Sequence, residues 1–272
     1  MEKLQLTQEQ LEYQQILYMI QNEGVKERVF QADSTWTDEQ KVLKNNYENN
    51  LYMPILIRYF HKFQDKNKRL PTQNEYVDAY LKHSFKHLKN KKWYDDKHKE
   101  FITNCIIWRA DRAYKSNLIE IITAKQLEML GYTVFRHRYI DIVMGVDLIA
   151  VKDNKYWCLH ITKNSKWAKD KIFAKGSYTD YTINHKLIMY RRNFKRHVRL
   201  LYDCENGYNN HVANGLPIFD NDYLIEKLDD YYSFDWDSED NQLLYLIERL
   251  KGRKAESESF EFVSTDKKLI IK

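Results

Sequence analysis

The apolar positions of the first 115 residues recur at helical spacing. Among these 115 residues a threonine is followed three residues later by Gln or Glu at Thr7–Gln10, Thr37–Gln40 and Thr72–Glu75, a pair that satisfies the first N–H groups of a helix. Apolar residues three and four positions apart follow each pair, and Gly24 offers a stop for the first helix. A further helix is expected from Lys99 to about Lys115. Residues 1–115 are therefore predicted to be a helical region.

The pattern changes near Ser116. A helix is expected over Leu118–Leu130, with Gly131 as its stop. Three stretches rich in β-branched and aromatic residues follow, as is typical of strands, at Tyr132–His137, Val146–Val151 and Tyr156–Thr162. The polar turn Lys152–Lys155 is expected to join the last two as a hairpin.

Helical and strand patterns continue through the last part of the chain. Helices are expected over about Lys166–Lys175 and Thr182–Arg192, and a fourth strand within Arg196–Asp203. The order α-β-β-β-α-β predicts an α/β (α+β) fold, a mixed β-sheet core flanked by helices. Turn residues, an acidic helical segment and an amphipathic helix near Asn241–Leu250 complete the chain. We therefore expect three parts, at residues 1–115, 116–205 and 206–272.

Composition shows an uneven distribution of charge. The 272 residues carry 44 Lys and Arg against 39 Asp and Glu, a net charge of +5. Residues 151–200 hold thirteen bases and three acids, whereas residues 203–262 hold five bases and fifteen acids. Three cysteines without a Cys-x-x-Cys pair encode neither a disulfide framework nor a structural zinc site. No apolar run is long enough to span a bilayer, so a cytoplasmic protein without membrane association is expected.

Cations alternate with aromatic residues in the basic part of the chain. Lysine and arginine neutralise phosphates, and aromatic rings stack on unpaired bases, so this pattern predicts nucleic-acid binding. The alternative is that the cations are only the solvated side of a helix whose core face includes Ile183, Leu187 and Ile188. The candidate nucleic-acid-binding residues are Lys163, Lys166, Trp167, Lys169, Lys171, Lys175, Lys186, Arg191, Arg192, Lys195 and Arg196.

Two residues in the predicted strands are candidates for chemistry. Asp147 stands in the apolar run VDLIAV, where an unpartnered carboxylate is costly to bury. His160 stands in an apolar strand and is either a core histidine with satisfied hydrogen bonds or a ligand or base. Motifs for phosphate-binding loops, dinucleotide folds, serine hydrolases, zinc proteases and EF-hands are absent from the sequence.

Residues 116–203 resemble the PD-(D/E)xK nuclease superfamily in three segments. These are the helix with Glu120, the strand GVDLIA at Gly145–Ala150 and the strand WCLHIT at Trp157–Thr162. In that family the helix carries a Glu and the next strand a metal-binding Asp. The following strand has an acid or Gln and then a Lys, separated by one residue. The resemblance implies a restriction-endonuclease-like fold that acts on DNA.

The third strand departs from the family pattern. His160 stands where the family has an acid or Gln, and Thr162 stands where it has Lys. Lys163 follows on the opposite face of the strand and would stabilise the phosphorane charge only if a bulge turned it inward. The resemblance implies that Glu120, Asp147 and His160 hold Mg²⁺ or Mn²⁺, with His160 as ligand or general base.

Three functions are open from the sequence. The first, which we take as the main expectation, is a DNA-binding, metal-dependent endonuclease that hydrolyses phosphodiesters with an atypical active site. The second is a catalytically inactive nuclease-fold adaptor that binds DNA or a partner protein, in DNA processing or defence by a phage or mobile element. The third is a protein-interaction module that uses the helical region or the acidic C-terminal segment, without DNA.

Overall fold

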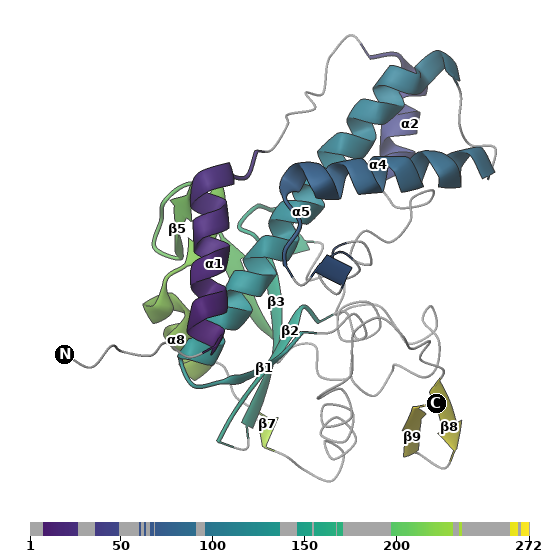
Figure 1. Ribbon diagram of the computed structural model, residues 1–272. Helices are drawn as coiled ribbons and strands as arrows, with labels where there is room; N and C mark the ends of the chain where they lie inside the picture. The colour runs from purple at the N-terminus through teal and green to yellow at the C-terminus, as the bar shows by residue number, and fades with distance from the viewer. Residues whose placement is uncertain are drawn as a thin grey trace. The chain divides into compact units, whose positions relative to one another are not determined.

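A computed structural model describes most of the helical and strand segments (Figure 1). The described residues are 8–26, 36–48, 60, 63, 66–67, 69–90, 96–136, 146–153, 155–166, 168–170, 197–230, 234–235, 262–265 and 268–271. The helices are α1 (Gln8–Glu23), α2 (Asp38–Glu48), α4 (Gln73–Asn90), the 3-10 helix η1 (Asp96–His98), α5 (Lys99–Met129) and α8 (Asn221–Asp230). The strands are β1 (Thr133–Phe135), β2 (Leu148–Lys152), β3 (Lys155–Lys163), β4 (Val198–Tyr202), β5 (Asn210–Ala213), β6 (Leu216–Phe219), β7 (Phe234–Asp235), β8 (Phe262–Thr265) and β9 (Lys268–Ile271).

The chain divides into two compact units. One comprises residues 20–118, and the other comprises residues 1–19 together with residues 119–272. The division falls within α5, between Leu118 and Ile119. No helix among the described residues combines the length and the apolar character that a membrane crossing needs.

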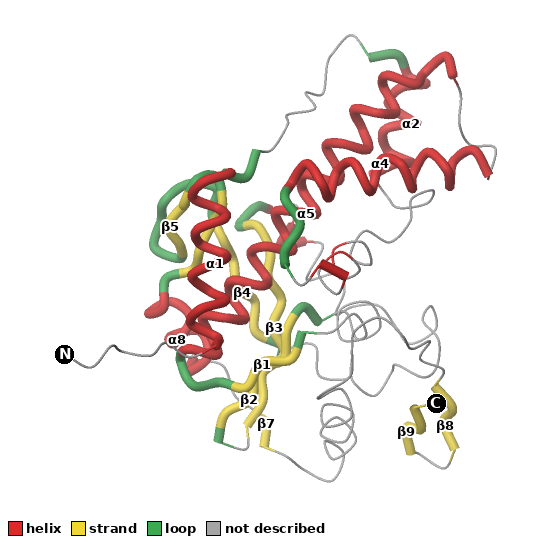
Figure 2. Tube along the Cα trace, viewed as in Figure 1, coloured by secondary structure: helices red, strands yellow, loops and turns green. Residues whose placement is uncertain are grey.

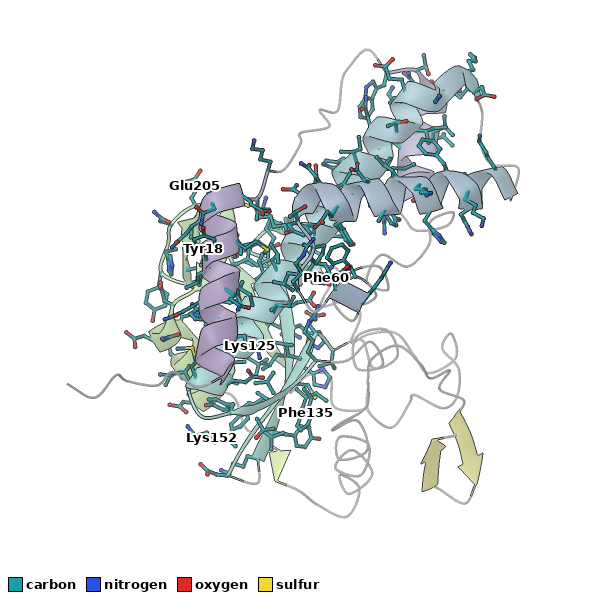
Figure 3. All side chains as sticks on the ribbon, in the orientation of Figure 1. Tyr18, Phe60, Lys125, Phe135, Lys152 and Glu205 are labelled. Atoms are coloured by element: carbon teal, nitrogen blue, oxygen red, sulfur yellow. The ribbon has the colours of Figure 1, made fainter. Side chains whose placement is uncertain are left out.

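An aromatic cluster forms part of the core of the unit at residues 20–118. Phe60, labelled in Figure 3, is fully buried, and its ring centroid lies 5.8 Å from that of Tyr76 and 6.0 Å from that of Tyr114. The rings of Tyr76 and Tyr114 are 5.6 Å apart. Rings at these separations bury large apolar areas and restrict each other's orientation. The cluster packs α4 against the N-terminal part of α5.

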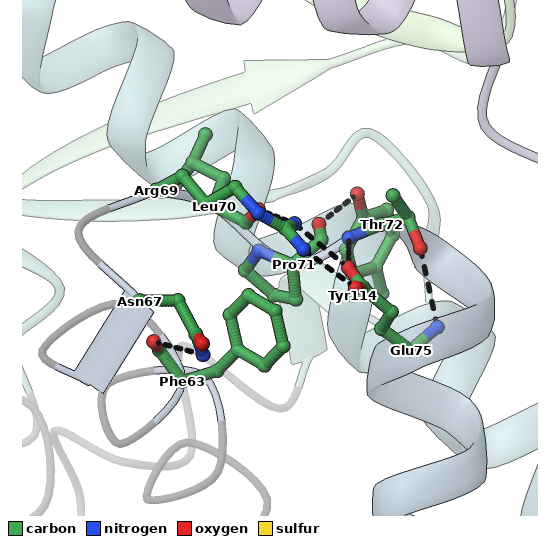
Figure 4. A network of polar contacts seen from close by, with 8 residues as sticks. All are labelled: Phe63, Asn67, Arg69, Leu70, Pro71, Thr72, Glu75 and Tyr114. Carbon is green, nitrogen blue, oxygen red and sulfur yellow. Dashed lines mark hydrogen bonds and ion pairs between the residues drawn. The ribbon is translucent and has the colours of Figure 1, made fainter.

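The first turn of α4 is held by a set of polar contacts (Figure 4). The Glu75 N–H donates to Thr72 Oγ1 at 3.2 Å, and the Thr72 N–H donates to Glu75 Oε2 at 2.8 Å. Arg69 forms two hydrogen bonds to the Glu75 carboxylate, which lowers the pKa of that group to about 2. The same reciprocal pair forms at Thr37 and Gln40, so two of the three predicted caps are confirmed. Thr7 lies outside the described residues.

A five-stranded sheet forms the centre of the other unit. Strands β1 to β4 are neighbours in chain order, and β2 pairs with both β1 and β3 in antiparallel orientation. The turn between Lys152 and Lys155 makes β2 and β3 a hairpin, which confirms the prediction. Strand β4 pairs with β3 in parallel, from Leu159 opposite Val198 to Lys163 opposite Tyr202. Strand β7 pairs with the first two residues of β3.

Side-chain contacts join the helices and strands of this unit, including the separate two-stranded sheet of β5 and β6. The Trp157 Nε1–H of β3 donates to the Leu228 carbonyl of α8 at 3.0 Å. The Gln126 Nε2–H of α5 donates to the Phe219 carbonyl at the end of β6 at 2.7 Å. Lys152, labelled in Figure 3, ends β2 with its ammonium 4.8 Å from the centroid of the Tyr132 ring. Figure 2 shows α1 beside α5, and the predicted mixed α/β class is confirmed.

Two expectations about secondary structure were wrong. The helices predicted on either side of Ser116 are one continuous helix, because the Asn117 side chain donates within that helix to the Ala113 carbonyl at 2.7 Å and does not form a turn. Turns were expected around Asn210, Asn214 and Pro217, where the chain instead forms the paired strands β5 and β6. Residues 171–196 and 236–250 are not described. The helices expected at Thr182–Arg192 and Asn241–Leu250 lie within them, as does most of the helix expected from Lys166.

Candidate functional site

Asp147 stands immediately before β2 and interacts with the backbone of β3. Its N–H donates to the Leu159 carbonyl at 3.0 Å, and its Oδ2 accepts the Ile161 N–H at 2.6 Å. Strand β2 begins at Leu148, which pairs with Leu159, so no residue of β2 lies opposite Ile161. The Asp147 carboxylate therefore accepts the Ile161 N–H beyond the end of the strand pairing. This contact accounts for an aspartate at the edge of an apolar strand without invoking a metal.

His160 lies in the interior, where it contacts a second histidine. It is 1% exposed, and His197, directly before β4, is 2% exposed. His160 Nε2 and His197 Nδ1 are 2.9 Å apart and share a hydrogen bond, and the two rings stack with centroids 5.1 Å apart. Burial, aided by the charge of Arg199, lowers the pKa of His197 to about 4. His197 is thus neutral at neutral pH.

Glu120 lies in the C-terminal part of α5 and is turned toward the residue after β1. Its Oε2 is 3.7 Å from Arg136 Nε, and the two side chains are 13% and 15% exposed. A partly buried carboxylate with a guanidinium beside it is held as an ion pair. Sequence reasoning treated Glu120 as a ligand and did not identify Arg136 as its partner.

Lys163 is the last residue of β3 and is exposed. The pairing of β3 with β4 continues residue by residue from Leu159 to Lys163. A bulge at Thr162 would interrupt this register, so the inward rotation on which the catalytic role of Lys163 depended does not occur. Thr162 itself is half-buried.

The described residues do not fit the metal site that the resemblance implies. Nowhere in the described ranges do three or more His, Cys, Asp or Glu side chains come together in a way that could hold a metal ion. Glu120, Asp147 and His160 therefore do not form a three-ligand group, and each contacts a protein group instead. The donor set consequently gives no support for Mg²⁺ or Mn²⁺.

Few of the predicted nucleic-acid-binding residues lie within the described part of the chain. Lys163 and Lys166 are exposed, and Lys169 is half-buried. The rest of that set falls outside the described residues, namely Trp167, Lys171, Lys175, Lys186, Arg191, Arg192, Lys195 and Arg196.

A polar pocket of about 190 Å³ lies away from these residues. It is lined by Tyr13, Gln126, Met129, His211, Phe219, Asp220 and Asn221. His211 Nδ1 and Asp220 Oδ1 are 3.2 Å apart at its edge. None of the predicted catalytic residues lines this pocket.

His197 was not among the predicted site residues, although it lies within the stretch Arg196–Asp203 in which a strand was expected. Comparison of the chain with protein-family models, curated proteins and solved structures gave no match. The assignment of function therefore rests on the residues of the chain itself.

Proposed function

We propose that this protein binds DNA through a nuclease-like core that does not hydrolyse it. The order of elements supports such a core. Helix α5 is followed by three strands paired in antiparallel orientation and then by β4, which is parallel to β3. The described elements agree with the order of helix and strands that the sequence pattern predicts for residues 116–205, the part of the chain that carries the resemblance to the PD-(D/E)xK superfamily.

The burial of His160 is the observation that carries the non-catalytic part of the proposal. A metal ligand or general base must reach the bound phosphate or its attacking water. His160 is 1% exposed and shares a hydrogen bond with another buried histidine. A phosphodiester in solvent cannot reach this ring unless the groups that bury it move away.

The distribution of charge supports DNA as the partner. Residues 151–200 hold ten more bases than acids. Two of these bases, Lys163 and Lys166, are among the described residues, and both are exposed. Cations that replace counterions along a phosphate backbone give affinity without reading sequence. We therefore expect binding that depends strongly on salt and weakly on base sequence.

The test measures binding and cleavage on the same protein. Wild type, Asp147→Ala and Asp147→Asn are incubated with labelled single-stranded, duplex and branched DNA, with Mg²⁺ and with Mn²⁺. The expected result is salt-sensitive binding by all three proteins and no cleavage by any of them. The Asn variant keeps an acceptor for the Ile161 N–H, so it controls for damage to the fold.

Cleavage by wild type that disappears in both Asp147 variants would overturn the non-catalytic part and restore the endonuclease. Absence of binding at low salt to every form of DNA would overturn the DNA part. The protein-interaction module would then be the function to test, by titration with candidate partner proteins.

A further inference from the structure

Helix α4 presents a lysine face opposite its buried face. The side chains that α4 buries are Gln73, Tyr76, Val77, Tyr80, Ser84 and Leu88. At about 100° per residue these positions form one stripe along the helix. Lys82, Lys86 and Lys89 are exposed and lie on the opposite side of the helix axis. They are four and three positions apart, so their ammonium groups lie along one line.

Lysines outnumber acids on this side of α4, where Asp78 stands four positions before Lys82. From Ala79 to Tyr94 the sequence has five lysines and no Asp or Glu, and the nearest acid on the exposed side of α4 is Asp78. Like charges three and four positions apart on a helix repel each other. The spacing of Asp78 and Lys82 and the favourable place of cations near a helix C-terminus offset part of this repulsion, and the three lysines leave the face with a net positive charge.

We propose that the lysine face of α4, formed by Lys82, Lys86 and Lys89, is a docking surface for the phosphate backbone of a nucleic acid. The proposal deepens the proposed function and rests on it for DNA as the partner. It adds a contact surface in the unit at residues 20–118, outside the basic segment at residues 151–200.

The surroundings of this face favour a nucleic acid over an anionic membrane. A helix that lies on a bilayer needs an apolar side to insert between the lipids. The apolar side of α4 is used within its own unit, where Tyr76, Tyr80 and Leu88 are at most 1% exposed. The described residues on the exposed side are small, polar or charged, and the lysine ammonium groups suit contacts with phosphate oxygens.

The start of α4 is anchored, so the lysines are carried on an ordered helix. The pair of Thr72 and Glu75 caps the first turn, and Arg69 holds the Glu75 carboxylate through two hydrogen bonds (Figure 4). The Tyr114 hydroxyl of α5 donates to the Pro71 carbonyl at 2.8 Å. A helix held at one end keeps the spacing of its exposed cations, which reduces the ordering required when they meet a phosphate backbone.

The experiment compares two sets of lysine substitutions in the full-length protein. The test variant combines Lys82→Gln, Lys86→Gln and Lys89→Gln. The matched control combines Lys26→Gln, Lys66→Gln and Lys99→Gln, which removes the same charge from exposed positions in the same unit. Binding to a labelled DNA duplex is measured by fluorescence anisotropy with EDTA, over a range of salt concentrations. Circular dichroism checks that each variant keeps its helices.

Each lysine that contacts a phosphate contributes about 0.9 to the slope of log affinity against log salt on duplex DNA. The test variant is expected to bind roughly tenfold or more weakly at low salt, with a slope lower by about 3. The control variant should bind like wild type.

Equal affinity and equal slope in the two variants would overturn the lysine face while leaving the proposed function intact. No binding of DNA by wild type at low salt would overturn both. A parallel arm uses vesicles that contain phosphatidylserine. Vesicle binding that the test variant alone loses, with DNA binding unchanged, would replace the nucleic acid by a membrane surface.

Discussion

The buried pair of His160 and His197 makes stability sensitive to mild acid. The pKa of His197 is about 4 in the folded chain, against an ordinary value of 6.5. Between these two pH values, His197 is therefore protonated in the unfolded chain and neutral in the folded chain. The stabilisation is complete above about pH 6.5 and is lost as the pH falls toward about 4. From about pH 7.5 to about pH 5, the expected loss is about 2 kcal/mol.

Urea unfolding of wild type and His197→Gln at these two pH values tests this reasoning. Glutamine does not titrate, so the variant should lose about 2 kcal/mol less stability than wild type over the same change of pH. His211→Gln is the control for replacing a histidine by glutamine, since that side chain is 56% exposed. The same pH dependence in wild type and His197→Gln would refute the argument that burial of His197 controls acid stability.

Three further predictions follow from single contacts. Asp147→Ala should lower the free energy of unfolding by about 1–3 kcal/mol, because the Ile161 N–H loses its acceptor. Asp147→Asn keeps an acceptor and should be destabilised less. Equal losses of stability for the two variants in thermal unfolding would contradict the contact. Thr72→Ala should cost about 1 kcal/mol in urea unfolding through loss of the helix cap, and no loss would show that Arg69 and Glu75 suffice. Gln126→Leu should lower the free energy of unfolding in urea by about 1–3 kcal/mol, because the Phe219 carbonyl loses its hydrogen-bond donor. An unchanged urea midpoint would show that this hydrogen bond between α5 and β6 does not stabilise the fold.

Local signals in the sequence predicted much of the fold. The caps at Thr37 and Thr72 and the hairpin of β2 and β3 depend on residues close in sequence, and all three formed. The hairpin of β5 and β6 was missed although its signal was present. Asn214 and Gly215 both have positive φ, of 47° and 87°, as the tight turn of a two-residue hairpin requires. The other turn residues nearby obscured this pair.

The candidate site was harder to predict because its residues have partners far away in sequence. Asp147 and Glu120 have the residue types of a metal site, and only the fold shows that one bonds the backbone of β3 and the other pairs with Arg136. His160 meets His197 across 37 residues, a contact that no local spacing encodes. Residue type indicated which positions are unusual, whereas their contacts depend on strand pairing.

The position of β3 at the centre of the sheet has a consequence for amide hydrogen exchange. It pairs with β2 along one edge and with β7 and β4 along the other, and its residues from Tyr156 to Ile161 are buried. Amide protons in such a strand exchange with solvent only when the sheet opens as a whole. The slowest-exchanging amides of this chain are therefore expected in β3. Their exchange rates would report the global free energy of unfolding without denaturant.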